Sequence, residues 1–229
     1  PKGEVFSPMS RHIFRKSAPI LLVGAGEISL HTVTKAFHLS KMIVAVDGGL
    51  TKLRETGLQA DVVIGDFDSV DDTGDVPRLH RPDQNATDFQ KALAAVDAPV
   101  IIGAGFLGGR LDHQFAAMTA LMGDPRPIIL LNDTDLCFLV PRHFQCPVPD
   151  GSPVAFYPLR PCRVQTSGVK YPVTDAAMAP DGLISTSNTM VGYILEIYTM
   201  GRGLLAILPL ACLPAVISAL QTKPTGPTK

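Results

Sequence analysis

The segment DVVIGDFDSV, residues 61–70, ends an apolar run with a glycine and two aspartates. Val62 to Ile64 has the continuous apolar character of a strand that is buried on both faces of a sheet. Asp66 and Asp68 follow, and in an extended chain residues two apart project to the same side. Neighbouring carboxylates repel each other unless they are protonated, paired or bound to a cation. The segment therefore predicts a buried strand whose end either caps a helix or holds a positive charge.

Similar apolar runs alternate with helical stretches through the first 134 residues. Strands are predicted in the segments PILLVGAG, MIVAVDGG, APVIIGAG and PIILLND. Helices are predicted over residues 30–39, 50–57, 87–96 and 111–123. This alternation predicts a parallel sheet with helices on both faces. In such sheets ligands bind beyond the carboxyl ends of the strands, and glycines and aspartates gather there in this chain.

The pattern changes near residue 135, where short strand-like runs are separated by Pro, Gly and Asp with no convincing helix among them. Such a pattern is typical of an antiparallel β-sandwich. The predicted fold class is therefore α/β, with a parallel-sheet domain over residues 1–134 followed by a sandwich domain over residues 135–222. The first eighteen residues are expected to form an irregular arm, and the polar tail 223–229 is expected to be disordered.

The composition, with 46% hydrophobic and 18% charged residues, is that of a folded protein. Lys plus Arg total 20 and Asp plus Glu 21, so charge gives no reason to expect nucleic-acid or membrane partners. The four cysteines lack metal-site spacing and are expected to be buried, reduced thiols. The apolar run Leu204–Leu220 is broken by Pro209 and Pro214 and is short for a bilayer span. We expect a soluble, cytoplasmic protein.

Two further carboxylates stand at the same predicted sheet edge. Asp47 ends a strand, and Gly48 and Gly49 after it leave room for a bulky anion. Asp88 stands with Thr87 at a predicted helix start, where free N–H groups and the helix dipole suit an anion. Capping alone is the simpler interpretation of Thr87. If these carboxylates converged with the two of the opening segment, they would form a site for Mg²⁺ and a polyphosphate.

The segment GAGFLGGRLDHQ, residues 103–114, offers an alternative function. Gly103, Gly105 and Gly108 satisfy the spacing G-x-G-x-x-G after a strand, and Asp133 stands where a ribose-binding acid could lie. A protein that binds NAD or FAD is therefore a second hypothesis. The chain beyond this point lacks the further strand–helix units that a dinucleotide fold needs, which weakens it.

The same segment continues with charged residues that a dinucleotide fingerprint does not need. The planar guanidinium of Arg110 could clamp a phosphate. Asp112 follows it on the predicted helix start, and His113 is interpreted as a helix-start histidine with a local partner. The sequence contains neither the P-loop pattern of nucleotide hydrolases nor the nucleophile motif of α/β-hydrolases.

In order along the chain, the segments VDGG, GDFDS, PDQNATDFQKAL, GGRLDH, SGVKYP and STSN resemble the thiamine pyrophosphokinase family. The resemblance implies an α/β domain followed by a β-sandwich, in a homodimer with active sites between the subunits. It also implies transfer of the pyrophosphoryl group of ATP to the hydroxyethyl group of thiamine, giving thiamine diphosphate and AMP. A non-catalytic thiamine or nucleotide sensor on this fold is a further alternative, but all the expected acids are present.

The resemblance implies roles for the residues at matching positions. Magnesium would be held by Asp47, Asp66, Asp68 and Asp88. Catalytic roles would fall to Asp66, Asp68, Asp88, Arg110 and Asp112. ATP would be bound by Gly48, Gly49, Thr87, Gly109 and Arg110. Thiamine would be bound by Gln84, Asp112, Ser187 and Asn188, although the last two are ordinary turn residues by composition. The proton acceptor is open between Asp68 and Asp112, and Asn85 departs from the acid that the family often carries there.

Overall fold

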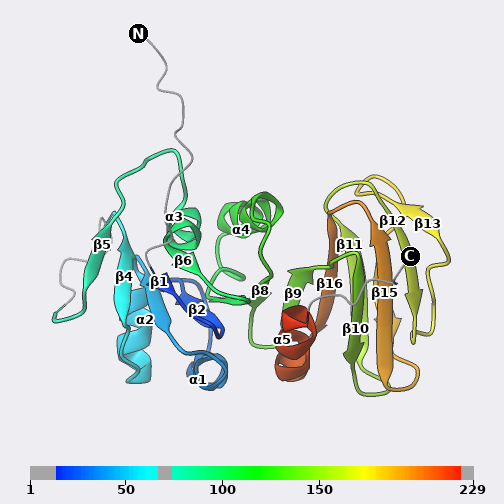
Figure 1. Ribbon diagram of the computed structural model, residues 1–229, viewed down its shortest axis with the longest axis horizontal. Coiled ribbons are helices and arrows are strands. Elements are labelled where there is room, and N and C mark those ends of the chain that lie inside the picture. The colour runs from blue at the N-terminus through cyan, green and yellow to red at the C-terminus, as the bar shows by residue number, and fades with distance from the viewer. Residues whose placement is uncertain (1–13, 67–73, 223–229) are drawn as a thin grey trace, which may run out of the picture.

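A ten-stranded mixed sheet runs through the computed structural model, which describes residues 14–66 and 74–222 (Figure 1). Its order is β14-β11-β16-β9-β8-β7-β2-β3-β4-β5. Six neighbouring strands are parallel: β2 (Ile20–Val23), β3 (Ile43–Val46), β4 (Val62–Gly65), β5 (Arg78–His80), β7 (Ile101–Ala104) and β8 (Ile128–Leu131). Four are antiparallel: β9 (Asp135–Leu139), β11 (Pro153–Pro158), β14 (Ser185–Thr189) and β16 (Leu204–Pro209). The predicted mixture of helices and sheets is confirmed.

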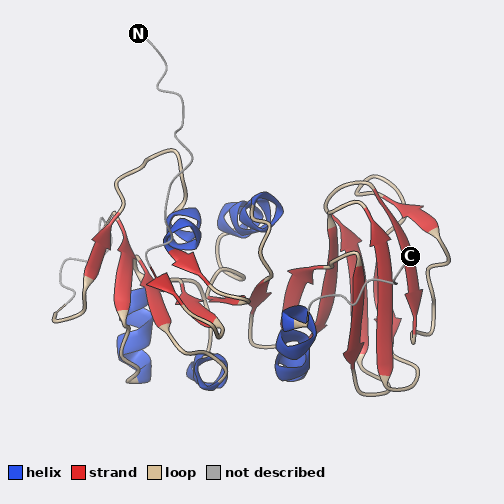
Figure 2. Ribbon diagram, in the orientation of Figure 1, coloured by secondary structure: helices blue, strands red, loops and turns tan. Residues whose placement is uncertain are grey.

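Helices cover both faces of the parallel part of the sheet (Figures 1 and 2). One face carries α1 (Leu30–His38) and α2 (Gly49–Thr56), and the other carries α3 (Asp88–Ala95) and α4 (Leu111–Gly123). α2 ends at Gly57, whose φ of 70° is left-handed, as its helix-ending position predicted. The strands between the two helical layers are apolar because both of their faces are covered, whereas the edge strand β5 is largely exposed.

The strand β2 shows this double burial residue by residue. Leu21 and Val23 belong to the core cluster that includes α1 and α2, whereas Ile20 and Leu22 belong to the cluster that includes α3 and α4. All four side chains are fully buried. Successive strand residues point to opposite faces, so a continuous apolar run is what a strand between two helical layers requires.

A second, antiparallel sheet packs against the antiparallel end of the first (Figure 2). Its order is β10 (His143–Pro147), β15 (Ile194–Met200), β12 (Cys162–Ser167) and β13 (Ala176–Met178). The rings of Phe138 on β9 and Phe144 on β10 lie 4.8 Å apart, centroid to centroid, within the larger core cluster. The change of pattern near residue 135 is therefore a change of strand direction inside one continuous sheet, since β9 pairs antiparallel with β8. The division into domains at residue 134 stays a prediction.

Two features differ from the sequence prediction. The chain after residue 135 was expected to contain no helix, but the 3₁₀ turn Leu210–Cys212 leads into α5 (Leu213–Gln221). Pro214 lies in the first turn of α5, where a missing N–H is tolerated, so it does not break this helix. Within the arm expected to be irregular, β1 (Phe14–Arg15) pairs with β6 (Val96–Asp97).

The remaining expectations concern the cysteines, membrane spans and the tail. All four cysteines are buried and unpaired, as predicted. Burial raises the pKa of Cys137 and of Cys146 to about 12, so these thiols are unreactive at neutral pH. In the described ranges no helix combines the length and apolar character needed to cross a bilayer. The tail 223–229 lies outside the described residues.

Candidate active site

A cavity of about 590 Å³ opens at the carboxyl ends of β2, β3 and β7. After β2 the chain builds the sheet outward through β3 and β4, and it then returns to add β7 on the other side of β2. The strand order therefore reverses between β2 and β7, which is the place where open α/β sheets bind their ligands. The wall is formed by residues 25–27, by Asp47 and Gly48, by the loop 105–110 and by the starts of α3 and α4.

The loops after β2 and β7 lie in direct contact at this edge. The N–H of Gly24 donates to the carbonyl of Ala104 at 2.8 Å, and the N–H of Gly26 donates to the carbonyl of Gly105 at 3.0 Å. A Cβ atom at Gly26 would lie 2.5 Å from the Gly105 oxygen, closer than any side chain tolerates. The two GAG segments are therefore glycine-rich because their backbones must touch.

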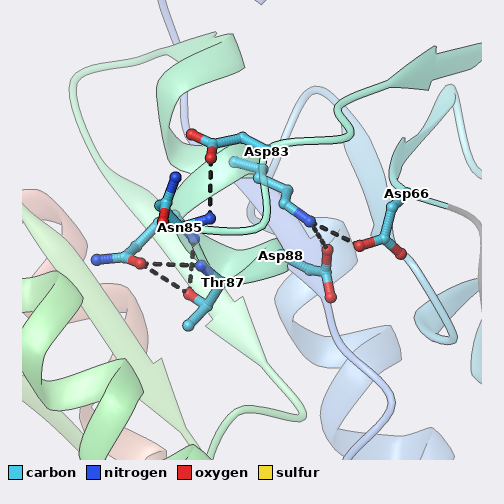
Figure 3. A network of polar contacts seen from close by, with 7 residues as sticks. Asp66, Asp83, Asn85, Thr87 and Asp88 are labelled. Carbon is cyan, nitrogen blue, oxygen red and sulfur yellow. Dashed lines mark hydrogen bonds and ion pairs between the residues drawn. The ribbon is translucent and has the colours of Figure 1, made fainter. Parts of the chain in front are cut away.

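Two of the predicted acids, Asp66 and Asp88, which Figure 3 labels, both accept hydrogen bonds from one lysine. The ammonium of Lys91 donates to Asp66 Oδ2 at 2.8 Å and to Asp88 Oδ1 at 2.9 Å. Asp66 follows the last residue of β4, and Asp88 is the first residue of α3 and lines the cavity. The structure thus brings these two acids together, with a protein cation between them.

Lys91 was not among the predicted site residues. Its side chain is only 4% exposed, and burial by itself would lower its pKa. The hydrogen bonds to Asp66 and Asp88 outweigh this effect, so the pKa lies above the usual value and the ammonium stays charged at neutral pH. The sequence did contain one signal for the contact between Lys91 and Asp88. Lys91 follows Asp88 by three residues, and residues three apart lie on the same face of a helix.

Asp47 lines the same cavity from the end of β3. Its backbone is left-handed, with φ 44°, while its N–H donates to the carbonyl of Ile64 on β4 at 2.9 Å. Its Oδ1 atom is buried and has no hydrogen-bond partner in the part of the chain that the structure describes. A buried carboxylate oxygen without a donor is rare and fits a position that a ligand or cation would contact.

The predicted convergence of four acids is seen in part. Asp47 and Asp88 line one cavity, and Asp66 is joined to Asp88 through Lys91. Asp68 lies outside the described residues. Within residues 14–66 and 74–222, no group of three or more His, Cys, Asp or Glu side chains is arranged to hold a metal ion.

The starts of α3 and α4 face the cavity with different local chemistry. Thr87 caps α3: its Oγ1 accepts the N–H of Gln90 at 3.3 Å, and Gln90 Oε1 accepts the N–H of Thr87 at 3.0 Å. The simpler interpretation of Thr87 is therefore confirmed, although this residue also lines the cavity. Arg110, which precedes α4, gives that helix no side-chain cap. The N–H of His113 in the first turn donates to Asp112 Oδ1 at 3.0 Å, so only the earlier N–H groups of this turn can serve an anion.

Arg110 and Asp112 form an exposed ion pair beside this helix start. The distance from Arg110 Nη2 to Asp112 Oδ2 is 2.6 Å. The hydrogen bond from Arg110 holds the pKa of Asp112 below its usual range, and Asp112 in turn raises the pKa of Arg110. Arg110, Gly109 and Gly48 line the cavity, as their predicted contact with ATP requires, whereas Asp112 and Gly49 are not in its wall.

The residues predicted to bind thiamine are not in this cavity. Gln84 and Ser187 are exposed, and Ser187 has a left-handed backbone with φ 57°. Asn188 is buried, and its side-chain amide accepts the N–H of Tyr171 at 3.0 Å and donates to the carbonyl of Tyr171 at 2.7 Å. Asn188 borders a second, shallower hollow of about 540 Å³ that Tyr171 also lines. Asn85 donates its backbone N–H to Asp83 Oδ1 at 2.9 Å, which forms a local turn.

Two sequence models of one family match this chain on either side of residue 135. The model described as "Thiamin pyrophosphokinase, catalytic domain" matches residues 33–127, which include Asp47, Asp66, Asp88 and Arg110. The model described as "Thiamin pyrophosphokinase, vitamin B1 binding domain" matches residues 142–199. The chain belongs to the thiamin pyrophosphokinase family. The resemblance seen in the sequence is confirmed, and with it the expected enzyme class, an ATP-dependent thiamine diphosphokinase.

Individual thiamin pyrophosphokinases are similar to this chain over most of its length. Thiamin pyrophosphokinase 1 of Caenorhabditis elegans is 28% identical over 176 residues, which are 66% of this chain and 72% of the worm protein. Thiamine pyrophosphokinase 3 of Oryza sativa subsp. japonica is 32% identical over 162 residues, 56% of this chain and 57% of the rice protein. The solved thiamin pyrophosphokinase of Candida albicans has a TM-score of 0.74 at 17% identity, covering 90% of this chain and 95% of that one, which supports the fold.

The dinucleotide hypothesis is not favoured for this chain. The acid that would bind a ribose, Asp133, is already engaged by Ser29, the N-cap residue of α1, and by Thr32. Its Oδ1 atom accepts the N–H of Ser29 at 3.0 Å, the hydroxyl of Ser29 at 2.7 Å and the hydroxyl of Thr32 at 2.6 Å. The glycines Gly105, Gly108 and Gly109 line the cavity, but Asp133 is not part of its wall.

The contact of Asp133 with the start of α1 predicts that the stability of the protein depends on pH. The Thr32 hydroxyl, together with Ser29, holds the pKa of Asp133 below its usual range. A lowered folded-state pKa adds stability above the unfolded pKa, near 4, and this stability is lost as the pH falls through the folded value. We expect Asp133→Ala to lower the melting temperature by about 2–4 °C at pH 7 and by less at pH 3. Thermal melts at both pH values test this, and an equal difference at both would contradict it.

Proposed function

We propose that pyrophosphoryl transfer from ATP to the hydroxyethyl group of thiamine takes place in the cavity beside β2, β3 and β7. One observation supports this placement. The cavity at the switch point of the sheet is lined by two predicted metal ligands, Asp47 and Asp88. It is also lined by two predicted ATP-binding residues, Gly109 and Arg110. Transfers of this kind depend on positioning and charge neutralisation more than on covalent chemistry.

The loop 105–110 and the start of α4 are suited to the phosphates. Gly105, Gly108 and Gly109 all have positive φ values, so the loop can present backbone N–H groups that other residues would turn away. The uncapped first turn of α4 adds N–H groups and the positive end of its dipole. The guanidinium of Arg110 is exposed beside them and can bind a phosphate through two parallel hydrogen bonds.

The acids on the opposite wall fit Mg²⁺ as a partner of the nucleotide. Carboxylate oxygens are the ligands that Mg²⁺ prefers, and the buried Oδ1 of Asp47 has no protein donor in the described chain. We propose that Asp47 and Asp88, with Asp66 and Asp68 beside them, would hold the ion. When bound, it would supply positive charge to the phosphate oxygens. Asp68 or Asp112 would accept the proton of the thiamine hydroxyl.

We propose that thiamine is bound between two copies of the chain. The residues with predicted thiamine contacts are divided: Gln84 and Asp112 belong to the first half, whereas Ser187 and Asn188 belong to the second. The second hollow is bordered by exposed apolar side chains, including Tyr171, which is 62% exposed. A second copy that covered this surface would bury apolar area and could bring the two groups together.

The dimer is testable by mass and by complementation. Analytical ultracentrifugation of the purified protein is expected to give twice the monomer mass at micromolar concentration. Two inactive variants, Asp88→Asn and Ser187→Trp, are expected to regain part of the activity when they are unfolded and refolded together. A monomer with full activity would contradict the shared site.

We also propose a cytoplasmic location, which suits four unpaired, buried cysteines.

The proposed reaction has a simple first test. The wild-type protein with ATP and Mg²⁺ is expected to form AMP only when thiamine is added, as measured by chromatography of the nucleotides. AMP formation that did not depend on thiamine, or binding of thiamine and ATP with no turnover, would contradict the reaction and would favour the sensor hypothesis.

A further inference from the structure

We propose that Lys91 is a positioning residue of the active site, which fixes the carboxylates of Asp66 and Asp88 as the two ends of one rigid ion triad. This inference rests on the proposed function, because it assigns those carboxylates to the metal–nucleotide. It goes beyond the proposed function in assigning the positive charge between the two acids to a side chain of the protein, Lys91. The ammonium of Lys91 contacts both Asp66 Oδ2 and Asp88 Oδ1, and Figure 3 labels both of these acids.

The geometry shows that Lys91 is built into the site. A lysine on a helix normally extends to solvent, but this one is 4% exposed and ends between two carboxylates that come from different elements. Asp66 follows β4, and Asp88 begins α3, so the triad connects the end of β4 to the start of α3. Each contact is a charge-assisted hydrogen bond of ordinary length.

The contacts divide the carboxylate oxygens into two sets. One oxygen of each aspartate faces Lys91, which leaves Asp66 Oδ1 and Asp88 Oδ2 outside the contacts with the ammonium. Because the ammonium donates to both acids, neither carboxylate can rotate without losing a part-buried hydrogen bond. Lys91 therefore sets the direction in which Asp88 presents its other oxygen to the cavity that it lines.

The ammonium also sets the charge of this wall. Two carboxylates without Lys91 would carry two negative charges close together, and they would attract a bare divalent cation strongly. With Lys91 the triad carries one net negative charge, which weakens binding of a bare cation and favours a cation that arrives with a polyphosphate. The weaker binding of a bare cation follows from the charge of Lys91 and its position between the two acids. An uncharged residue of the same size at this position would not weaken that binding.

The test compares Lys91→Met with wild type in two independent measurements. Lys91→Met is expected to lower kcat for AMP formation at least 10-fold while the KM for thiamine stays within 2-fold. In nucleotide-free protein, the same variant is expected to bind Mn²⁺ at least 3-fold more tightly, as measured by electron paramagnetic resonance of the free ion. Lys91→Arg keeps the charge and is expected to bind Mn²⁺ within 2-fold of wild type and to recover part of kcat.

The matched control is Lys52→Met. Lys52 forms an ion pair with Glu55 at 3.2 Å, also within one helical turn, but on α2 and outside the cavity wall. It is expected to change neither kcat nor Mn²⁺ binding. If Lys91→Met does not give a folded protein by circular dichroism, Lys91→Gln removes the charge while keeping one donor, and the same 3-fold change is expected.

Two results would overturn the role of Lys91. One is a neutral variant with kcat within 2-fold of wild type, and the other is a folded neutral variant whose Mn²⁺ affinity is unchanged or weaker. A wild-type protein that forms no AMP would instead contradict the proposed reaction, and the Mn²⁺ measurement would still test the placement of the charge.

Discussion

Asp88→Asn is expected to lower kcat for AMP formation by about 100- to 1000-fold while the protein remains folded. Asp88 lines the cavity, accepts a hydrogen bond from Lys91 and stands at the first position of α3. The substitution keeps the shape of the side chain and removes its charge. Because the cap of α3 is formed by Thr87 and Gln90, the helix does not depend on this carboxylate. Steady-state kinetics with circular dichroism on the same samples measure both effects.

Asp97→Asn is the matched control for this prediction. Asp97 also forms an ion pair, with Arg15 at 2.8 Å, but it lies on β6 and outside the cavity wall. The same substitution is expected to leave kcat within 2-fold of wild type. If Asp88→Asn kept more than a tenth of the wild-type kcat at saturating Mg²⁺, the assignment of Asp88 to the phosphate and metal wall would be wrong.

Gly49→Ala is expected to lower the free energy of unfolding by about 3 kcal/mol or more. Gly49 is the first residue of α2, and a Cβ atom there would lie 1.8 Å from the carbonyl oxygen of Val23. That oxygen is main chain at the end of the central strand β2, so no side-chain rotation relieves the contact. Either α2 or the loop after β2 has to move, and residues 25–27 of that loop border the cavity. Urea unfolding followed by circular dichroism gives the free energy.

The same substitution at another helical glycine provides the control. Gly123 is the last residue of α4, and an added Cβ would meet nothing within 4 Å. Gly123→Ala is expected to be neutral or to raise the free energy of unfolding by up to about 1 kcal/mol, because alanine restricts the unfolded chain. Equal stabilities for the two variants would show that the close approach at Gly49 does not limit the packing of α2 on the sheet.

The sequence predicted the parallel part of the fold well for a physical reason. Strands such as Ile20–Val23 and Ile128–Leu131 lie between two helical layers, so they are apolar at every position and are visible as uninterrupted runs. β5 (Arg78–His80) lies at the edge of the sheet, and its Arg78 and His80 are exposed, so the single apolar residue between them carried no such signal. α5 was missed because Pro214 was taken as a break, although a first-turn proline is compatible with a helix.

The site was predicted less completely, because contact between distant segments cannot be read from spacing. The location of Asp47 and Asp88 on one cavity followed from the rule that parallel strands end at a common edge. Lys91 was missed because a lysine in a helical stretch normally signals an exposed face, and only the fold shows that Asp66 lies beside it. The thiamine contact of Asn188 stays a prediction. The contact of its amide with the backbone of Tyr171, between residues 17 apart, could not be read from the sequence.

The most direct test of the proposed reaction follows the phosphorus atoms of ATP. The wild-type protein would be incubated with Mg²⁺, thiamine and ATP labelled at the β-phosphate, and the products would be separated by chromatography. Attack of the thiamine hydroxyl on the β-phosphorus predicts that the label appears in thiamine diphosphate in a 1:1 ratio with unlabelled AMP. Label that remained in ADP beside thiamine monophosphate, or that stayed in ATP, would contradict pyrophosphoryl transfer.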